Sequence, residues 1–89
     1  MKKPRDIERI IKGVANHRRI EILQLLAQKP ELSVDEVAEE LSINYKTASE
    51  HIRRTALAGL VMKRHDVNSV RHALTPTGKA ILKFLRTLE

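Results

Sequence analysis

The 89-residue sequence contains no cysteine and almost no aromatic residues: one Phe, one Tyr and no Trp. Without cysteine the chain can form no disulfide, no thiolate metal site and no cysteine nucleophile. Modules that stack single-stranded bases on aromatic side chains are disfavoured by the scarcity of aromatics. No apolar run has the length of a membrane span, and no apolar signal region follows the basic start at residues 1–5. We therefore expect a cytoplasmic protein with no membrane partner.

Charge is plentiful and unevenly distributed. Seventeen Lys and Arg residues against eleven Asp and Glu residues give a formal net charge of +6, which suits a polyanionic partner but could also serve solubility alone. Residues 31–40 carry five acidic side chains and no basic one, whereas residues 44–54 and 61–72 are net basic. This polarity predicts one face that avoids phosphate groups and two segments that could approach them.

The length of 89 residues predicts a single domain over residues 1–89, and the apolar spacing predicts that it is mostly helical. A first helix is expected over about residues 5–15, where apolar side chains recur on one face. Asn16 is a typical N-cap for a second helix at residues 17–28, which is apolar almost all round and therefore central. A capping box at residues 33–36 predicts a short third helix.

The third helix stops at Ser42-Ile43-Asn44 and a new helix begins almost at once, over about residues 45–58. The hydrophobic period then changes to that of a strand, which predicts a β-hairpin over about residues 61–74. Pro76 follows a Thr and opens a last helix over about residues 77–88. The predicted fold class is mostly α with a small β-hairpin, a winged helix-turn-helix.

This arrangement explains why the helix at residues 45–58 has few apolar positions. One face, with Ala48, Ile52 and Thr55 or Ala56, packs inward, and the other can meet base edges in the DNA major groove, while the hairpin lies along the backbone or minor groove. Lys and Arg can reach phosphates or guanine, Ser and Thr can bond to bases, and Glu can accept from cytosine. The candidate DNA-binding residues are Tyr45, Lys46, Thr47, Ser49, Glu50, His51, Arg53 and Arg54 on the helix, and Lys63, Arg64, His65, Asn68, Ser69 and Arg71 on the hairpin.

Residues 13–75 resemble the winged helix-turn-helix core of the ArsR family of repressors. The matching motifs are N-x-x-R-x-x-I-L-x-L-L from Asn16, L-S-V-x-E-V-A from Leu32, T-x-S-x-H-I from Thr47 and A-G-L-V from Ala58. The ending LTPTGKAIL is equally typical of the MarR and PadR families. The resemblance implies a sequence-specific regulator of transcription on double-stranded DNA, a repressor, located with the nucleoid.

The resemblance also implies a homodimer formed by the first and last helices. The apolar stripes of the first and last helices agree with a dimer, because together they form more apolar surface than a small monomer should leave exposed. Packing of the two helices against each other within one chain remains the alternative. The candidate interface residues are Ile7, Ile10, Ile11, Val14, Ile81, Phe84, Leu85 and Leu88.

Neither a metal site, a cofactor nor an enzyme activity is expected. Metal-sensing members of the family carry ELCVCDL where this chain reads ELSVDEV, with Ser33 and Asp35 in place of the two cysteines. None of the four histidines pairs with another at the spacing of a helical zinc site. Ser49, Glu50 and His51 are consecutive on a helix, so they point in different directions and cannot form a triad.

Two other functions remain open from the sequence. The fold could be a protein-docking module, which would require apolar anchors on the outer face, where Tyr45, Leu57 and Val67 are the candidates. It could also be an architectural protein that binds DNA with little regard to sequence. The operator, the genes controlled and any effector cannot be read from the sequence.

Overall fold

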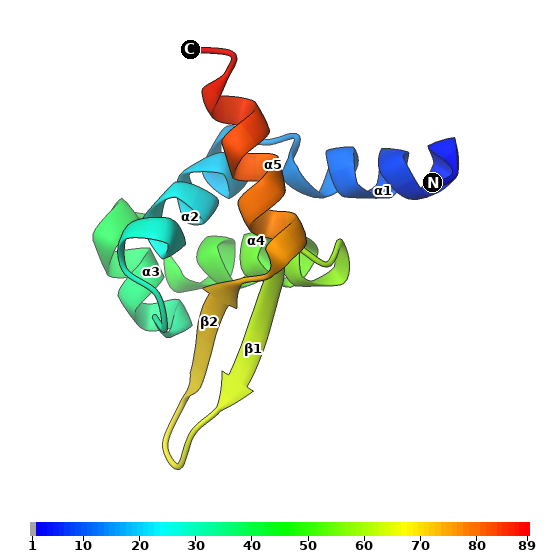
Figure 1. Ribbon diagram of the computed structural model, residues 1–89. Coiled ribbons are helices and arrows are strands. Elements are labelled where there is room, and N and C mark those ends of the chain that lie inside the picture. Colours follow the sequence, from blue (N-terminus) through cyan, green and yellow to red (C-terminus); the bar gives the residue numbers. More distant parts are fainter. Residues whose placement is uncertain (1) are drawn as a thin grey trace.

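The computed structural model describes residues 2–89 and consists of five helices and one β-hairpin (Figure 1). The hairpin projects from one end of the helical body, and we call residues 61–74 the wing. The winged helix-turn-helix architecture predicted from the sequence is confirmed. The elements are α1 (Pro4–Val14), α2 (His17–Gln28), α3 (Val34–Leu41), α4 (Tyr45–Leu57), β1 (Val61–His65), β2 (Val70–Leu74) and α5 (Pro76–Arg86).

Side-chain caps set most of the helix starts. The Asn16 side chain accepts from the backbone N–H of Arg18 at 2.8 Å, and the Asn44 side chain accepts from that of Thr47 at 2.7 Å. The reciprocal bonds of the capping box at residues 33–36 are both present. Gly59 follows α4 with a φ of 79°, a left-handed conformation that glycine adopts without strain.

The terminal helices differ from the predicted ranges by one or two residues. Both begin at a proline, Pro4 and Pro76, because the first helical position needs no backbone N–H. Helix α5 ends at Arg86, so Leu88 lies in the turn beyond it rather than on the helix.

The core forms around α2, as its nearly all-round apolar sequence predicts. Ile22 and Leu23 are completely buried, and Ile52 of α4 packs into the same cluster. Leu82 is the buried apolar residue of α5, and it was missing from the apolar stripe expected there. Gly78 lies one turn earlier, where an added Cβ would overlap the carbonyl oxygen of Leu60. This close approach turns Leu82 inward and leaves Phe84 exposed.

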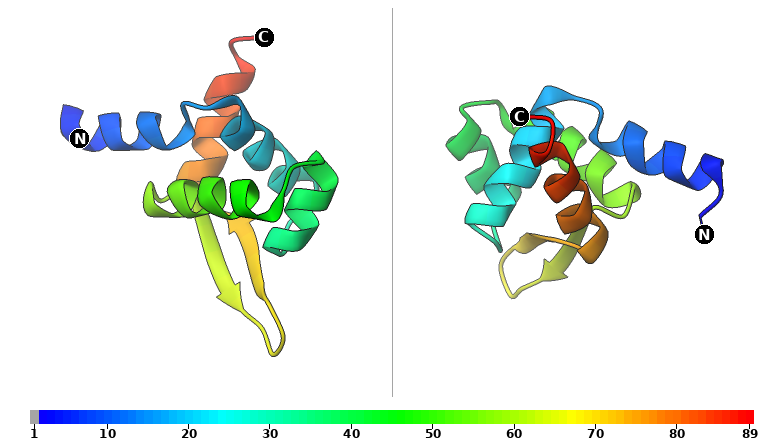
Figure 2. Two further views of the ribbon diagram at one scale, coloured as in Figure 1. Left: turned by 180° about the vertical axis from the view of Figure 1, so that it is seen from behind. Right: turned by 45° about the horizontal axis from the view of Figure 1, so that its top comes forward.

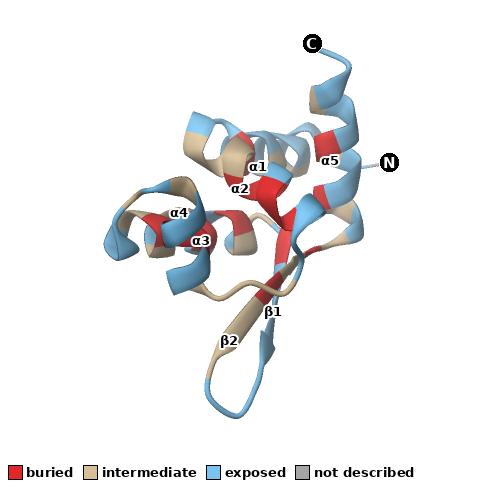
Figure 3. Ribbon diagram, turned by 90° about the vertical axis from the view of Figure 1, so that its left-hand side faces the viewer, coloured by how far each residue is buried: buried red, intermediate tan, exposed pale blue. Residues whose placement is uncertain are grey.

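The wing is buried in the core at one end only. In Figure 3 the buried residues gather on the inner sides of the helices and at the near end of the hairpin, while the far end is exposed. Strands β1 and β2 are antiparallel, with Val61 opposite Leu74 and His65 opposite Val70. Seen from behind (Figure 2, left), α4 lies across the molecule next to α3 and above the wing, so α4 and the wing are open to the same side.

Candidate nucleic-acid interface

The face of α4 opposite the core carries polar and charged side chains. Ala48, Ile52 and Thr55 are buried, and the Thr55 hydroxyl is satisfied by donating to the Ile52 carbonyl at 2.8 Å. Lys46, Glu50 and Arg53 are exposed on the other side, with Thr47 and Ser49 half-buried at its edges. Leu57 continues the outer stripe and is 68% exposed, so the inward turn of Thr55 leaves this leucine in solvent.

Glu50 organises the two arginines that follow it. Its carboxylate accepts from Arg53 at 2.7 and 3.1 Å and from Arg54 at 3.1 Å. These bonds lower the pKa of Glu50 to about 2, so the group is ionised throughout the neutral range. Each guanidinium has five N–H donors and therefore keeps some for another acceptor. The outer face of α4 thus presents a preformed Glu–Arg cluster next to Lys46.

A groove of about 330 Å³ separates the start of α4 from the wing. We call it the wing groove. Lys63 pairs with His72 and His65 with Val70 in the hairpin, so these side chains share the face that looks into the groove. The structure therefore brings together most of the wing candidates with the first residue of α4. The lining residues are Ser33, Val34, Asp35, Tyr45, Lys63, His65, Asn68, Ser69, Val70 and His72.

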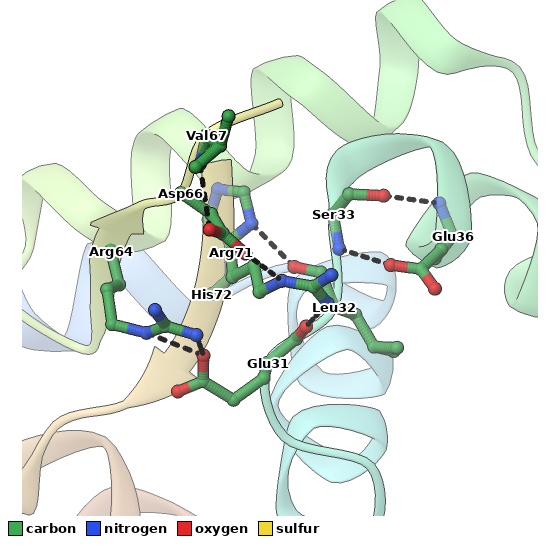
Figure 4. A network of polar contacts seen from close by, with 9 residues as sticks. All are labelled: Glu31, Leu32, Ser33, Glu36, Arg64, Asp66, Val67, Arg71 and His72. Carbon is green, nitrogen blue, oxygen red and sulfur yellow. Dashed lines mark hydrogen bonds and ion pairs between the residues drawn. The ribbon is translucent and has the colours of Figure 1, made fainter. Parts of the chain in front are cut away.

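The other face of the hairpin carries Arg64 opposite Arg71, and both reach the loop between α2 and α3 (Figure 4). Arg64 donates to the Glu31 carboxylate at 2.6 and 2.9 Å. Arg71 donates to the Glu31 carbonyl at 2.9 Å and to the Asp66 carboxylate at 3.3 Å. Both wing arginines are therefore engaged by carboxylates or a carbonyl of the chain itself before any partner arrives.

Backbone bonds complete the attachment of the wing to this loop. The N–H of Glu31 donates to the His72 carbonyl at 2.8 Å, and the N–H of His72 donates to the Leu32 carbonyl at 2.9 Å. Glu31 adopts a φ of 70°, a conformation that is uncommon for a residue with a side chain. The loop thus adds one isolated antiparallel bridge, between Leu32 and His72, beside the two-stranded hairpin and ties the wing to the body.

His72 is the buried polar residue at this junction. Its Nδ1 lies 2.8 Å from the Leu32 carbonyl oxygen, and because that oxygen can only accept, Nδ1 carries the proton. Burial lowers the pKa of His72, which favours the neutral imidazole. Neither His72 nor Glu31 was among the candidate site residues expected from the sequence. The one available signal was a histidine at an inward position of a strand.

His51, a candidate DNA contact, lies on the side of α4 that faces α2. Arg19 donates its Nε–H to His51 Nδ1 at 3.3 Å. Burial, together with the charge of Arg19, lowers the pKa of His51. The neutral ring therefore joins α2 to α4 and lies apart from the outer stripe of Lys46 and Arg53.

An apolar groove of about 210 Å³ lies between α1 and α5, and we call it the terminal-helix groove. Ile7, Ile11 and Phe84 are each about half exposed around it, and Leu88 is exposed beyond it. Ile10 is half-buried against the core, and Val14 is 4% exposed, so Val14 supports the groove from beneath. The lining residues are Ile11, Val14, Ala15, Ile20, Ile81, Phe84 and Leu85.

The described part of the chain also lacks two other kinds of feature. No group of three or more His, Cys, Asp or Glu side chains in residues 2–89 is placed to hold a metal ion. Among residues 2–89, no helix has both the length and the continuous apolar surface that a membrane span requires.

Comparison with known proteins places this architecture among transcription regulators. Residues 16–63 match the family model described as "Bacterial regulatory protein, arsR family". The transcriptional activator HlyU of Vibrio cholerae is 34% identical over 80 residues, which are 89% of this chain and 73% of HlyU.

Solved structures extend the similarity to nearly the whole chain. The structure of HlyU from V. cholerae superposes with a TM-score of 0.84 at 31% identity and covers 99% of this chain and 97% of its own. The homodimeric winged helix-turn-helix DNA-binding domain of Mb0332 from Mycobacterium bovis gives a TM-score of 0.78 at 29% identity, covering 93% of this chain and 74% of its own.

Proposed function

Since the chain belongs to the arsR family of bacterial regulatory proteins and is a DNA-binding winged helix-turn-helix regulator of transcription, we propose that it works as a homodimer that recognises a specific sequence in double-stranded DNA. The observation that carries the proposal is the outer face of α4, which is polar, basic and open on the same side as the wing. A regulator of this kind acts at the nucleoid in the cytoplasm.

Helix α4 is the element proposed to enter the major groove. Lys46 lies in its first turn, where recognition helices usually contact bases, with Ser49 and Arg53 following on the same side. Glu50 repels phosphates and therefore suits a base edge that offers a donor, such as the amino group of cytosine. The wing groove and the exposed Lys63 are proposed to follow the phosphate backbone beside it.

The terminal-helix groove is the proposed dimer interface. Its lining, which includes Ile11 and Phe84, is almost entirely apolar, and the half-exposed Ile7 extends the apolar surface beyond it. The Mb0332 domain, which shares this fold, is described as homodimeric. A two-fold dimer would present two copies of α4 to the two halves of an inverted repeat.

Repression is our proposal for the direction of regulation, although the V. cholerae relative is named an activator. A dimer bound over a promoter would block polymerase without needing any further domain. A reporter gene behind the recognised site measures the direction: expression should rise when the protein is absent.

The polar, exposed stripe of α4 favours DNA binding over protein docking as the function of this chain. Docking surfaces depend on clustered apolar anchors. Tyr45, Leu57 and Val67 are exposed, but charged or polar residues surround them. An architectural protein would use the same face as a specific regulator, and the ratio of affinities for different sequences separates the two.

Lys46→Ala should reduce affinity for the preferred duplex by about 1–3 kcal/mol and affinity for scrambled duplex much less, because base contacts specify and phosphate contacts position. Lys63→Ala is the matched control, since it removes the same charge from the wing and should weaken both duplexes by a similar factor. Fluorescence anisotropy on the two duplexes measures this. Equal weakening by Lys46→Ala would make Lys46 a backbone contact and move base reading towards Tyr45, Ser49 and Arg53.

Glu31→Gln should narrow the difference between specific and nonspecific binding. It releases Arg64, which raises the affinity for any duplex, and it loosens the wing, which lowers the affinity for the preferred one. Glu40→Gln is the control, because it removes the same charge from a carboxylate that pairs with Lys29 and does not line the wing groove. If both variants change the two affinities in parallel, Glu31 has no role in specificity.

A further inference from the structure

A third groove, of about 360 Å³, lies between α1 and the last turns of α4. We call it the α1–α4 groove. None of its α1 residues was a candidate for DNA binding. Five of the nine residues that line it are cationic and only one is acidic, so it has a strong positive excess. The lining residues are Arg5, Glu8, Arg9, Lys12, Gly13, Arg19, Arg54, Leu57 and Ala58.

The floor of this groove is fixed by a close helix crossing. Gly13 is buried against α4, and a Cβ added there would overlap the Cβ of Ala58. Arg19 reaches the same place from α2: its Nη1 donates to the Lys12 carbonyl at 2.9 Å and its Nε to His51 at 3.3 Å. One cation is therefore held rigidly at the junction of three helices.

The remaining cations are only partly neutralised. Arg54 shares the Glu50 carboxylate with Arg53, and Lys12 lies 3.5 Å from Glu8 with both side chains largely exposed. Such an exposed pair contributes little. Arg5 and Arg9 are exposed and form no ion pair with another of residues 2–89.

The groove would stay open in the proposed dimer. Arg5, Arg9 and Lys12 lie one turn apart along one side of α1, whereas Ile7 and Ile11 lie on another side, towards the terminal-helix groove. Arg54 lines the α1–α4 groove and is joined through Glu50 to the outer stripe of α4. A duplex lying along α4 would therefore approach α1 with its backbone.

We propose that the α1–α4 groove is a phosphate-binding site that takes backbone phosphates of the same duplex that α4 reads. Arginines that line a concave surface suit phosphate oxygens, which they can bind in a bidentate manner. The inference rests on the proposed function in naming DNA as the source of the phosphate. A free phosphorylated small molecule offers the same chemistry and is the other source to be tested.

The test is the variant Arg5→Gln/Arg9→Gln. Its control, Lys79→Gln/Lys83→Gln, removes two equally exposed charges from α5, outside the groove. Each lost phosphate contact lowers the slope of log affinity against log salt by about 0.9. For a dimer, the groove variant should therefore lower the slope by about two to four units and affinity by about tenfold or more. The control should change the slope by less than one unit. Sedimentation should show both variants as dimers.

Equal slopes for the two variants would overturn the site, because nonspecific charge alone would then explain the loss. Inorganic pyrophosphate is the probe for a free ligand, measured by titration calorimetry without DNA. Millimolar or tighter binding to wild type that the groove variant loses would assign the site to a small phosphate compound. If the wild-type protein binds no duplex at all, the proposed function fails. The pyrophosphate titration alone then tests the phosphate site in the α1–α4 groove, and absence of pyrophosphate binding would reject that site.

Discussion

Replacing Ile11 and Phe84 with glutamate should convert the protein into a monomer whose affinity for DNA is at least about a hundredfold lower. Both side chains are about half exposed at the rim of the terminal-helix groove, so the folded protomer tolerates a charge there while an apolar interface does not. A monomer can contact only one half-site. Joining two recognition helices in one dimer raises the affinity for the full site by about 10²–10⁴, and a monomer loses this gain.

Exposed positions make this a sharper test than Ile81 or Leu85. Those two side chains also pack against the core of their own protomer, so a charge there would unfold the chain as well as divide the dimer. Gln24→Glu/Gln28→Glu is the matched control, since it adds two charges to an exposed side of α2. Sedimentation velocity and circular dichroism on all three proteins give mass and fold. A wild-type monomer at micromolar concentration would contradict the proposed interface.

Affinity for duplex DNA should fall about a thousandfold or more between 50 and 200 mM salt. The reason is counterion release from about 6–10 phosphate contacts in the dimer. Lys63 and His65 in the wing groove and Arg53 and Arg54 on α4 are the groups expected to make many of them.

The internal ion pairs of the wing affect how steeply the affinity for DNA falls with salt. Arg64 and Arg71 must exchange Glu31 and Asp66 for phosphates, and this exchange reduces their contribution. Anisotropy titrations at four or five salt concentrations measure the slope. A nearly flat profile would favour the protein-docking function instead.

Features set by local sequence were predictable. Asn16, Asn44 and the capping box at residues 33–36 fix helix starts through bonds that span only two or three residues. Gly59 ends α4 for an equally local reason. The outer stripe of α4 followed from the 3.6-residue period once the small inward residues were identified.

Features that depend on distant contacts were not predictable. Glu31 meets Arg64 across 33 residues of sequence, and its left-handed backbone is not one that a glutamate signals. The inward turn of Leu82 follows from the contact between Gly78 and Leu60. The cationic α1–α4 groove is assembled from three helices, and no single segment of the sequence contains it.

Selecting bound sequences from a random pool of duplexes with the wild-type protein would test, in one experiment, whether a dimer binds duplex DNA in a sequence-specific way. We expect enrichment of an inverted repeat whose half-sites are about one helical turn apart, centre to centre, because two copies of α4 read it together. Recovery of the pool with no enriched sequence would contradict specific recognition, and enrichment of a lone half-site would contradict the dimer.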